Sequence, residues 1–200
     1  MDKMTGRLPS PGIRALIAYG TRYGATAGTS EEIARILRGE GFDVKVVDLK
    51  EEKVRDISGY DLVVVGSGIP MGMWAREADD FLKRFHKDLA QKKHAIFAST
   101  MKTMAEREGK IEQVARTRKI ALEDKATKYN LHPISQGFFG GVIDYNKMSF
   151  LTKATMNLVK PQLEQDGFKE AQPGVYDLRD WDEIRDWAKE LAARSRLAGE

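Results

Sequence analysis

The sequence predicts an α/β fold built around a doubly wound parallel sheet. Short apolar runs rich in β-branched residues, such as Leu62-Val63-Val64-Val65, alternate with longer segments of helical period along most of the chain. The connections between successive runs are long enough to hold the crossover helices that parallel strands need. The first apolar run also passes through a glycine-rich turn directly into a helical segment. These three observations favour a sheet covered by helices on both faces.

Composition limits the classes of protein to which the chain can belong. It has 200 residues, 42% of them hydrophobic and 32% charged, which suits one domain over residues 13–200 after a flexible arm at 1–12. The absence of cysteine excludes thiolate metal sites and iron–sulfur ligation, so we expect no metal, and any redox chemistry needs an organic cofactor. A net charge of +3 gives little support for nucleic-acid binding. No apolar run of about 18 residues occurs, so we expect a cytoplasmic protein.

Residues 13–37 are predicted to form a strand, a turn and a helix, and the turn has the composition of a phosphate-binding loop. Gly20 and Gly24 permit a positive φ and a close approach of the backbone to an anion. The helix that follows offers free N–H groups and the positive end of its dipole. The residues expected to bind the phosphate are Thr21, Arg22, Tyr23, Gly24, Ala25 and Thr26. The alternative is an ordinary strand–turn–helix connection in which glycine only sharpens the turn.

Two other phosphate-binding patterns are missing from this turn. No G-x-x-x-x-G-K-[ST] motif is present, and no G-x-G-x-x-G follows the first strand. Loops of the ATP-binding and dinucleotide-binding types are therefore disfavoured.

The remaining elements are expected in regular alternation. Further strands are predicted over 44–49, 61–66, 94–99 and 134–139, and helices over 26–37, 75–89, 105–130 and 180–197. Residues 162–175 are expected to be a connection containing glycine and proline. In the 105–130 helix the inward stripe is predicted at Ile111, Val114, Ala115, Arg118 and Leu122, and in the last helix at Trp181, Ile184, Trp187 and Leu191.

The loop after the third strand is uncharged and carries large, soft side chains, although a surface loop is normally polar. Open α/β sheets bind ligands outside the carboxyl ends of their strands, so this loop lies at the same edge as the phosphate-type loop. Thioether and indole side chains suit a flat aromatic ring. The residues expected to support such a ring are Ser67, Gly68, Ile69, Met71, Gly72, Met73 and Trp74. The alternative is that Met71, Met73 and Trp74 pack beneath the following helix.

A third loop at this edge follows the strand over 94–99. Its hydroxyl and backbone groups are candidates for hydrogen bonds to the polar rim of the ring, and the residues concerned are Ser99, Thr100, Met101 and Lys102. Lys102 is a candidate for stabilising negative charge on a reduced ring. The alternative is that it is a surface lysine near the start of a helix.

Residues 146–160 form a basic and apolar segment with three lysines and no acidic residue. On a helix its apolar side chains would cover most of the circumference. Such a segment serves to cap a ligand, to contact a membrane surface or to face another subunit, and burial against the sheet is the alternative. We therefore expect either a free cytoplasmic protein or one associated with the inner face of the membrane through 146–160.

These motifs resemble those of the flavodoxin superfamily over nearly the whole chain. Thr21-Arg22-Tyr23-Gly24-Ala25-Thr26 is similar to the T/S-x-T-G-x-T loop with which flavodoxins hold the phosphate of FMN. Within the superfamily, the chain most resembles the menaquinone-dependent protoporphyrinogen oxidase group. That likeness rests on the TRYGAT loop at 21–26, GSGIPMGMW at 66–74, the basic segment after GFFGGVIDYNK at 137–147, and Tyr176-Asp177 with Asp180-Trp181 before the last helix.

The resemblance implies a five-stranded parallel sheet in the order 2-1-3-4-5 and FMN as the cofactor, with no side chain acting as a catalytic acid or base. It implies an oxidoreductase that oxidises a porphyrinogen-like substrate and passes electrons to a quinone. The alternative is a flavodoxin-type shuttle between redox partner proteins, and a homo-oligomer is compatible with either function. The third loop, STMKTM, lacks the tyrosine that electron-carrier flavodoxins stack on the flavin, and the chain is basic, which weakens the shuttle interpretation. Ala27-Gly28-Thr29 are additional to the oxidase pattern.

Overall fold

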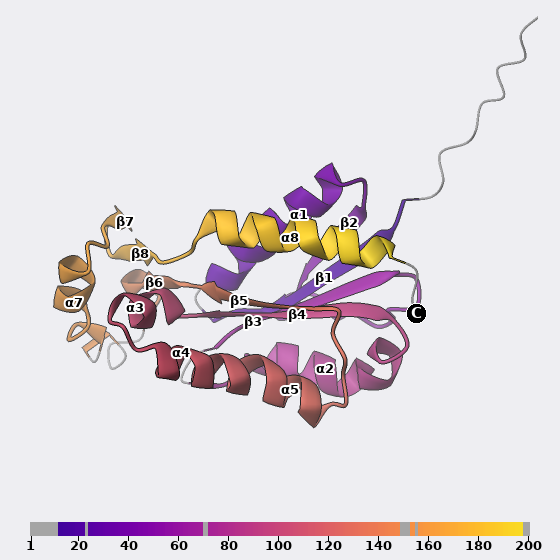
Figure 1. Ribbon diagram of the computed structural model, residues 1–200, viewed down its shortest axis with the longest axis horizontal. Helices are drawn as coiled ribbons and strands as arrows, with labels where there is room; N and C mark the ends of the chain where they lie inside the picture. The colour runs from indigo at the N-terminus through magenta and orange to yellow at the C-terminus, as the bar shows by residue number, and fades with distance from the viewer. Residues whose placement is uncertain (1–11, 23, 70–71, 149–152, 155, 198–200) are drawn as a thin grey trace, which may run out of the picture.

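The main sheet has five parallel strands in the order β2-β1-β3-β4-β5, as predicted (Figure 1). The computed structural model describes residues 12–22, 24–69, 72–148, 153–154 and 156–197, so most of the arm predicted at 1–12 lies outside the described residues. The strands are β1 (Arg14–Gly20), β2 (Asp43–Asp48), β3 (Leu62–Gly68), β4 (Lys93–Thr100) and β5 (Ser135–Gly140). Strand β1 lies between β2 and β3, so the direction of winding changes beside it.

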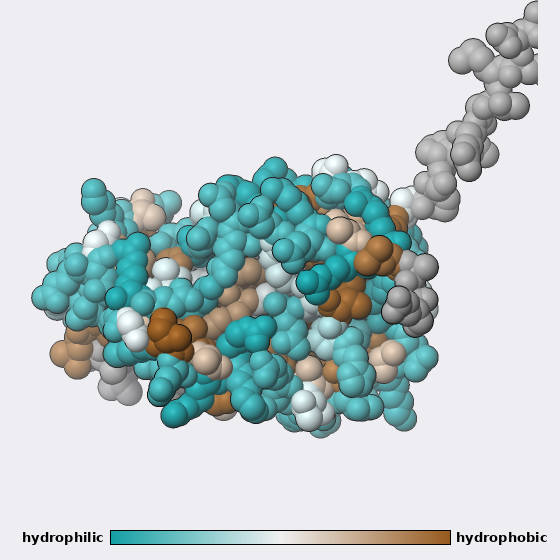
Figure 2. All heavy atoms as spheres, in the orientation of Figure 1, coloured by the Kyte–Doolittle hydropathy of each residue, from teal (hydrophilic) through white to brown (hydrophobic). Residues whose placement is uncertain are grey.

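Helices cover both faces of this sheet, as its continuous apolar strands require. On one face lie α1 (Ala25–Gly39) and α8 (Trp181–Arg196), and on the other lie α2 (Arg76–Leu89) and the helical segments that follow β4 (Figure 1). Each face has its own core of buried residues. The visible surface is mostly hydrophilic, with hydrophobic side chains in small groups (Figure 2). None of the described helices is long and apolar enough to cross a membrane.

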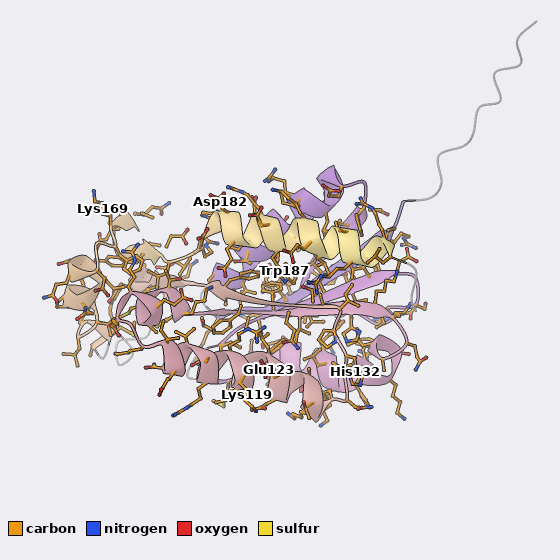
Figure 3. The ribbon with its side chains drawn as sticks, viewed as in Figure 1. Lys119, Glu123, His132, Lys169, Asp182 and Trp187 are labelled. Carbon is orange, nitrogen blue, oxygen red and sulfur yellow. The ribbon has the colours of Figure 1, made fainter. Side chains whose placement is uncertain are left out.

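An aromatic cluster fixes α8 against the sheet. Trp187 points from α8 toward the strands (Figure 3) and meets Phe139 at 5.5 Å and Phe97 at 6.3 Å between ring centroids, both edge-on. The Phe97 ring lies so close to Gly66 that a Cβ there would come within 2.2 Å of it. Any side chain at residue 66 would therefore displace the cluster.

The segment predicted as one helix over 105–130 is divided into several pieces. Helix α3 (Lys102–Arg107) ends before Gly109, which has a φ of +70°. Then come α4 (Ile111–Arg118), the π-helical turn η2 (Lys119–Glu123) and α5 (Asp124–Lys128). The inward stripe was predicted wrongly in part, because Ile111 is 63% exposed and Ala115 is also exposed. Leu122 is buried and Val114 packs against the core, as predicted. Ala121 and Ala126 are also buried there, since the π turn shifts the buried positions from a strict helical period.

A second, antiparallel sheet follows β5 and was not predicted. It contains β6 (Val142–Asp144), β8 (Val175–Asp177) and β7 (Glu170–Gln172), in the order β6-β8-β7. Its residues pack with α7 (Lys160–Gln165) around Tyr176 and Leu163. The chain leaves the main sheet at Gly141 and returns at Leu178, where the Leu178 N–H donates to the Gly141 carbonyl over 2.9 Å.

The prediction of a connection over 162–175 was therefore wrong. The connection predicted over 162–175 contains most of α7 and all of β7. The basic segment over 146–160 begins with a 3₁₀ turn, η3 (Tyr145–Lys147), and extended backbone at Met148, and its described residues 153, 154 and 156 are helical. Among the described residues that follow, a turn over 157–159 precedes α7, because Pro161 favours a new helix start at this point.

Candidate functional site

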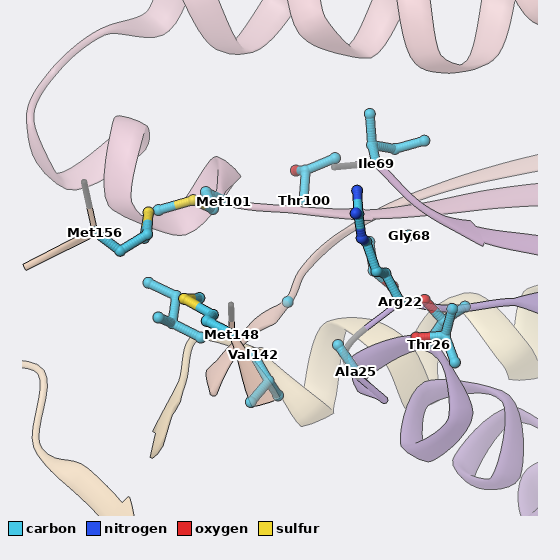
Figure 4. Close-up of a pocket in the computed structure, with 14 residues that line it drawn as sticks. Arg22, Ala25, Thr26, Gly68, Ile69, Thr100, Met101, Val142, Met148 and Met156 are labelled. Atoms are coloured by element: carbon cyan, nitrogen blue, oxygen red, sulfur yellow. The ribbon is translucent and has the colours of Figure 1, made fainter. Parts of the chain in front are cut away.

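A cavity of about 280 Å³ lies at the carboxyl ends of β1, β3 and β4, between the main sheet and the small sheet (Figure 4). Its position follows from the topology, because the chain winds in opposite directions on the two sides of β1. The lining residues are Thr21, Arg22, Ala25, Thr26, Gly68, Ile69, Ser99, Thr100, Met101, Gly141, Val142, Ile143, Met148 and Met156.

One end of the cavity is formed by the turn between β1 and α1. Gly24 has a φ of +91° and precedes the first residue of α1, and its N–H donates to the Thr21 hydroxyl over 3.0 Å. Thr26 is completely buried, and its Oγ1 has no hydrogen-bond partner among the described residues. A Cβ on Gly68 would lie 3.2 Å from that oxygen, so glycine at 68 leaves space beside the hydroxyl. A buried hydroxyl at a helix N-terminus suits an anionic ligand.

The second loop is held in place by hydrogen bonds behind the cavity. The Ser67 hydroxyl donates to the Gly68 carbonyl and accepts the Ala75 N–H, each over 2.8 Å. The Trp74 indole N–H donates over 2.7 Å to the carbonyl of Ala121 in the π turn. Trp74 is 7% exposed and belongs to the core, so the structure places it beneath the following helix rather than in the cavity.

The third loop contributes a second unpaired hydroxyl to the cavity wall. Ser99 is buried and its Oγ has no hydrogen-bond partner among the described residues, although its carbonyl accepts the Ile69 N–H over 3.1 Å. Lys102 points elsewhere, because its Nζ pairs with Glu183 of α8 at 2.6 Å. Lys102 therefore forms an ion pair between α3 and α8 and does not line the cavity.

The opposite end of the cavity is apolar and comes largely from the segment after β5. Met101, Met148 and Met156 gather there, whereas the Arg22 side chain extends across the cavity toward Ile69 (Figure 4). The Tyr145 hydroxyl donates to the Met156 carbonyl over 2.8 Å and so fixes this wall. Burial raises the pKa of the Tyr145 hydroxyl, so the donor proton is retained at neutral pH.

The structure brings together nine of the residues predicted for the site and leaves six other described ones outside the cavity lining. The nine are Thr21, Arg22, Ala25, Thr26, Gly68, Ile69, Ser99, Thr100 and Met101. Of the others, Gly24, Ser67, Gly72, Met73, Trp74 and Lys102 do not line it, and Met73 is 67% exposed. Tyr23 and Met71 lie outside the described residues.

Three lining residues were not predicted for the site: Gly141, Val142 and Ile143. Met148 and Met156 also line it, and they belong to the segment over 146–160 for which capping a ligand was one of the alternatives. Pro173-Gly174 separates two short runs, and Val175-Tyr176-Asp177 has strand composition, which indicates a hairpin at this point. That pattern does not indicate the pairing of β6 with β8, on which the position of residues 142–144 depends.

The cavity therefore suits an elongated ligand with an anionic end and a flat, apolar body. The Thr26 hydroxyl and the α1 N-terminus lie at one end, and thioethers lie at the other. Methionine side chains adapt to a planar ring and contact it favourably. Among the described residues, no group of three or more histidine and acidic side chains is placed to hold a metal ion.

The strand order and the site at the carboxyl ends of β1, β3 and β4 define a protein of the flavodoxin-like class. A family model described as the flavodoxin domain matches residues 16–169, and the chain belongs to this family.

Known proteins resemble the chain over most of its length. It is 24% identical over 183 residues to a protein from Leishmania major named protoporphyrinogen IX dehydrogenase (quinone), with 90% of this chain and 75% of that protein covered. A solved flavodoxin from the domain Archaea superposes with a TM-score of 0.55 at 13% identity, over 92% of this chain and all of the other. A short-chain flavodoxin associated with a non-canonical PDU bacterial microcompartment gives 0.52 at 14% identity, over 92% and 99%. The two solved flavodoxins share the fold of this chain.

Proposed function

We propose that this protein is an FMN-dependent oxidoreductase that oxidises a porphyrinogen-like substrate and passes the electrons to a quinone. The observation that carries the proposal is the polarity of the cavity, with the buried unpaired hydroxyl of Thr26 at the α1 end and a methionine wall at the other. A cofactor with one terminal phosphate and a planar ring system matches both ends.

The residues present suit this cofactor. Thr26 Oγ1 and the backbone at the start of α1 would bind the phosphate, and Ser99 Oγ is available to the polar rim of the ring. Ile69 and the methionines would contact the ring faces and exclude water. FMN supplies the one- and two-electron chemistry when bound, and the protein contributes position and electrostatic environment. No side chain is assigned as a catalytic acid or base.

Two findings favour an enzyme over an electron shuttle. The name of the Leishmania major relative describes dehydrogenation of a porphyrinogen with a quinone acceptor, which is the reaction class proposed here. The wall contributed by the segment after β5 also encloses the cavity on one side. An apolar surface beside the ring also suits a hydrophobic substrate that binds next to the cofactor.

The proposal is tested in two stages with the purified protein. An absorption spectrum and mass spectrometry of the released cofactor are expected to identify FMN, and FAD or the absence of flavin binding would refute the cofactor assignment. Steady-state oxidation of protoporphyrinogen with a menaquinone analogue is then expected to show turnover that saturates with both compounds. One-electron exchange with a flavodoxin reductase, without such turnover, would instead establish the shuttle function.

A further inference from the structure

The chain carries its sulfur only in methionine. Its sequence has eight methionines and no cysteine, so thioethers are the groups with which a mild oxidant of sulfur can react. Of the five methionines in the described part of the chain, three line the cavity, at the end opposite the Thr26 hydroxyl (Figure 4). These are Met101, Met148 and Met156. The apolar wall of the cavity is therefore also its oxidisable part.

Met101 is the cavity methionine most open to solvent. Its exposed fraction is 39%, whereas Met148 and Met156 are half-buried. Met104 packs against the core of the small sheet instead and does not line the cavity. A small dissolved oxidant therefore reaches the Met101 sulfur before the other sulfurs of this wall.

The backbone on both sides of Met101 is held by hydrogen bonds that do not involve the Met101 side chain. The Met101 carbonyl accepts the Met104 N–H over 3.2 Å at the start of α3. The Thr100 hydroxyl accepts the Lys102 N–H over 3.1 Å. A chemical change at the Met101 side chain therefore alters the cavity wall while β4 and α3 keep their hydrogen bonds.

We propose that Met101 is a site of reversible oxidation, at which hydrogen peroxide converts the thioether to a sulfoxide and so weakens binding of a flat apolar ligand in the cavity. The inference rests on the proposed function, because the ligand is taken to be the flavin ring. The sulfur forms a bond to one peroxide oxygen as the O–O bond breaks. Sulfur loses two electrons, and the second oxygen takes both protons and leaves as water.

The sulfoxide changes the character of the wall. Its oxygen is polar, and the face of a flat ring would separate it from water without offering a hydrogen-bond donor. Ile69 and Ile143, which line the same cavity, have no side-chain donor for it either. Methionine sulfoxide reductases return the sulfoxide to the thioether, so the effect is reversible.

The test combines peroxide treatment with flavin titration. Apoprotein of the wild type and of Met101→Leu is incubated with hydrogen peroxide, and the oxidised residues are identified by peptide mass spectrometry. FMN and riboflavin are then titrated by flavin fluorescence. The oxidised wild type should lose about tenfold in affinity for both flavins, the effect of removing one unpaired polar group from water, and a sulfoxide reductase should restore it. Met101→Leu should bind like the wild type before and after treatment, because leucine is apolar, similar in size and not oxidised.

Met73 provides the matched control. It is 67% exposed and lies outside the cavity lining, so peroxide should oxidise it at least as readily as Met101. Met73→Leu should therefore lose flavin affinity on treatment just as the wild type does. Met101→Gln places a polar group in the wall and should show the lower affinity without any peroxide.

The outcomes separate this inference from the proposed function. A wild type that binds neither flavin before treatment would refute the proposed function, and with it the ligand of this site. A wild type that binds flavin before treatment, and equally well once the Met101 sulfoxide has formed, would refute the inference alone. Oxidation of Met73 without Met101, or an equal loss of affinity in treated Met101→Leu, would also refute it. So would unfolding of the oxidised wild type in circular dichroism, because the effect would then lie in the fold and not in the cavity wall.

Discussion

Replacing Thr26 with valine should stabilise the ligand-free protein while weakening cofactor binding. The Thr26 side chain is completely buried, and its hydroxyl lacks a partner among the described residues. Burying an unpaired hydroxyl costs about 1–3 kcal/mol, and valine replaces it with a methyl group of similar size. We expect the free energy of unfolding of the apoprotein to rise by about 1 kcal/mol, which raises Tm by about 2–4 °C in a domain of this size.

The same substitution removes a hydrogen-bond donor from the proposed phosphate site. FMN binding should weaken by about 1–3 kcal/mol, the value of a hydrogen bond to a charged acceptor. Thermal unfolding of the apoprotein followed by circular dichroism gives the first quantity, and fluorescence titration gives the second. The two effects have opposite signs, which distinguishes a ligand-binding hydroxyl from a structural one.

Thr29 provides a matched control within the same helix. It is also completely buried, but its hydroxyl donates to the Ala25 carbonyl over 3.3 Å. Thr29→Val should therefore leave the apoprotein no more stable than the wild type and leave FMN affinity unchanged. A lower Tm for the Thr26→Val apoprotein, or an unchanged dissociation constant for FMN, would refute the assignment of this hydroxyl to the phosphate.

Three further predictions concern the scaffold and the surface. Trp74→Phe leaves the Ala121 carbonyl in the π turn without its indole donor, so chemical denaturation should show a loss of about 1–2 kcal/mol. Hydrogen bonds from Arg35 lower the pKa of Glu32 from 4.5 to about 2, so Glu32→Gln should cost about 2 kcal/mol at neutral pH and progressively less from pH 4.5 toward 2. If residues 146–160 contact an anionic membrane, Leu158→Ser should reduce sedimentation with anionic liposomes at low salt, because Leu158 is 81% exposed.

Each of these predictions has its own control. Trp187→Phe removes an indole N–H that has no partner among the described residues and should cost less than Trp74→Phe. For Glu32, the folded-state pKa lies below the unfolded value, so the stabilisation is complete above the unfolded pKa and is lost as the pH falls. A wild-type advantage over Glu32→Gln that persisted at pH 2 would contradict this reasoning. Wild-type protein that failed to sediment with anionic liposomes at low salt would rule out the membrane contact.

The main sheet could be predicted because its strands are long and buried on both faces. Residues such as Val63 and Val65 form continuous apolar runs that are easily separated from helical segments. The three loops at the carboxyl edge could be located for the same reason, since each begins where a strand ends. Side-chain directions within a loop are set by tertiary contacts, which is why Trp74 and Lys102 could not be assigned from the sequence.

The small sheet escaped prediction because its strands are short and only partly buried. In β7, all three residues are exposed, so no apolar alternation marks the strand. Met148 and Met156 have the same apolar character whether they lie on a helix or in a cavity wall. Their placement depends on the pairing of β6 with β8, which joins residues far apart in the sequence. Contacts of this kind are not encoded in any local pattern.

The meeting of Gly141 with Leu178 makes the intervening segment a module of the fold. A Cβ on Gly140 would come within 2.0 Å of the Leu178 carbonyl, so the two ends of the excursion lie against each other. Loop length between adjacent anchor points has only a small effect on closure entropy. The length of the segment between these two anchor points can therefore change at a small cost in closure entropy. Replacing this segment would change one wall of the cavity. The loops that follow β1, β3 and β4 belong to the main sheet and would keep their place.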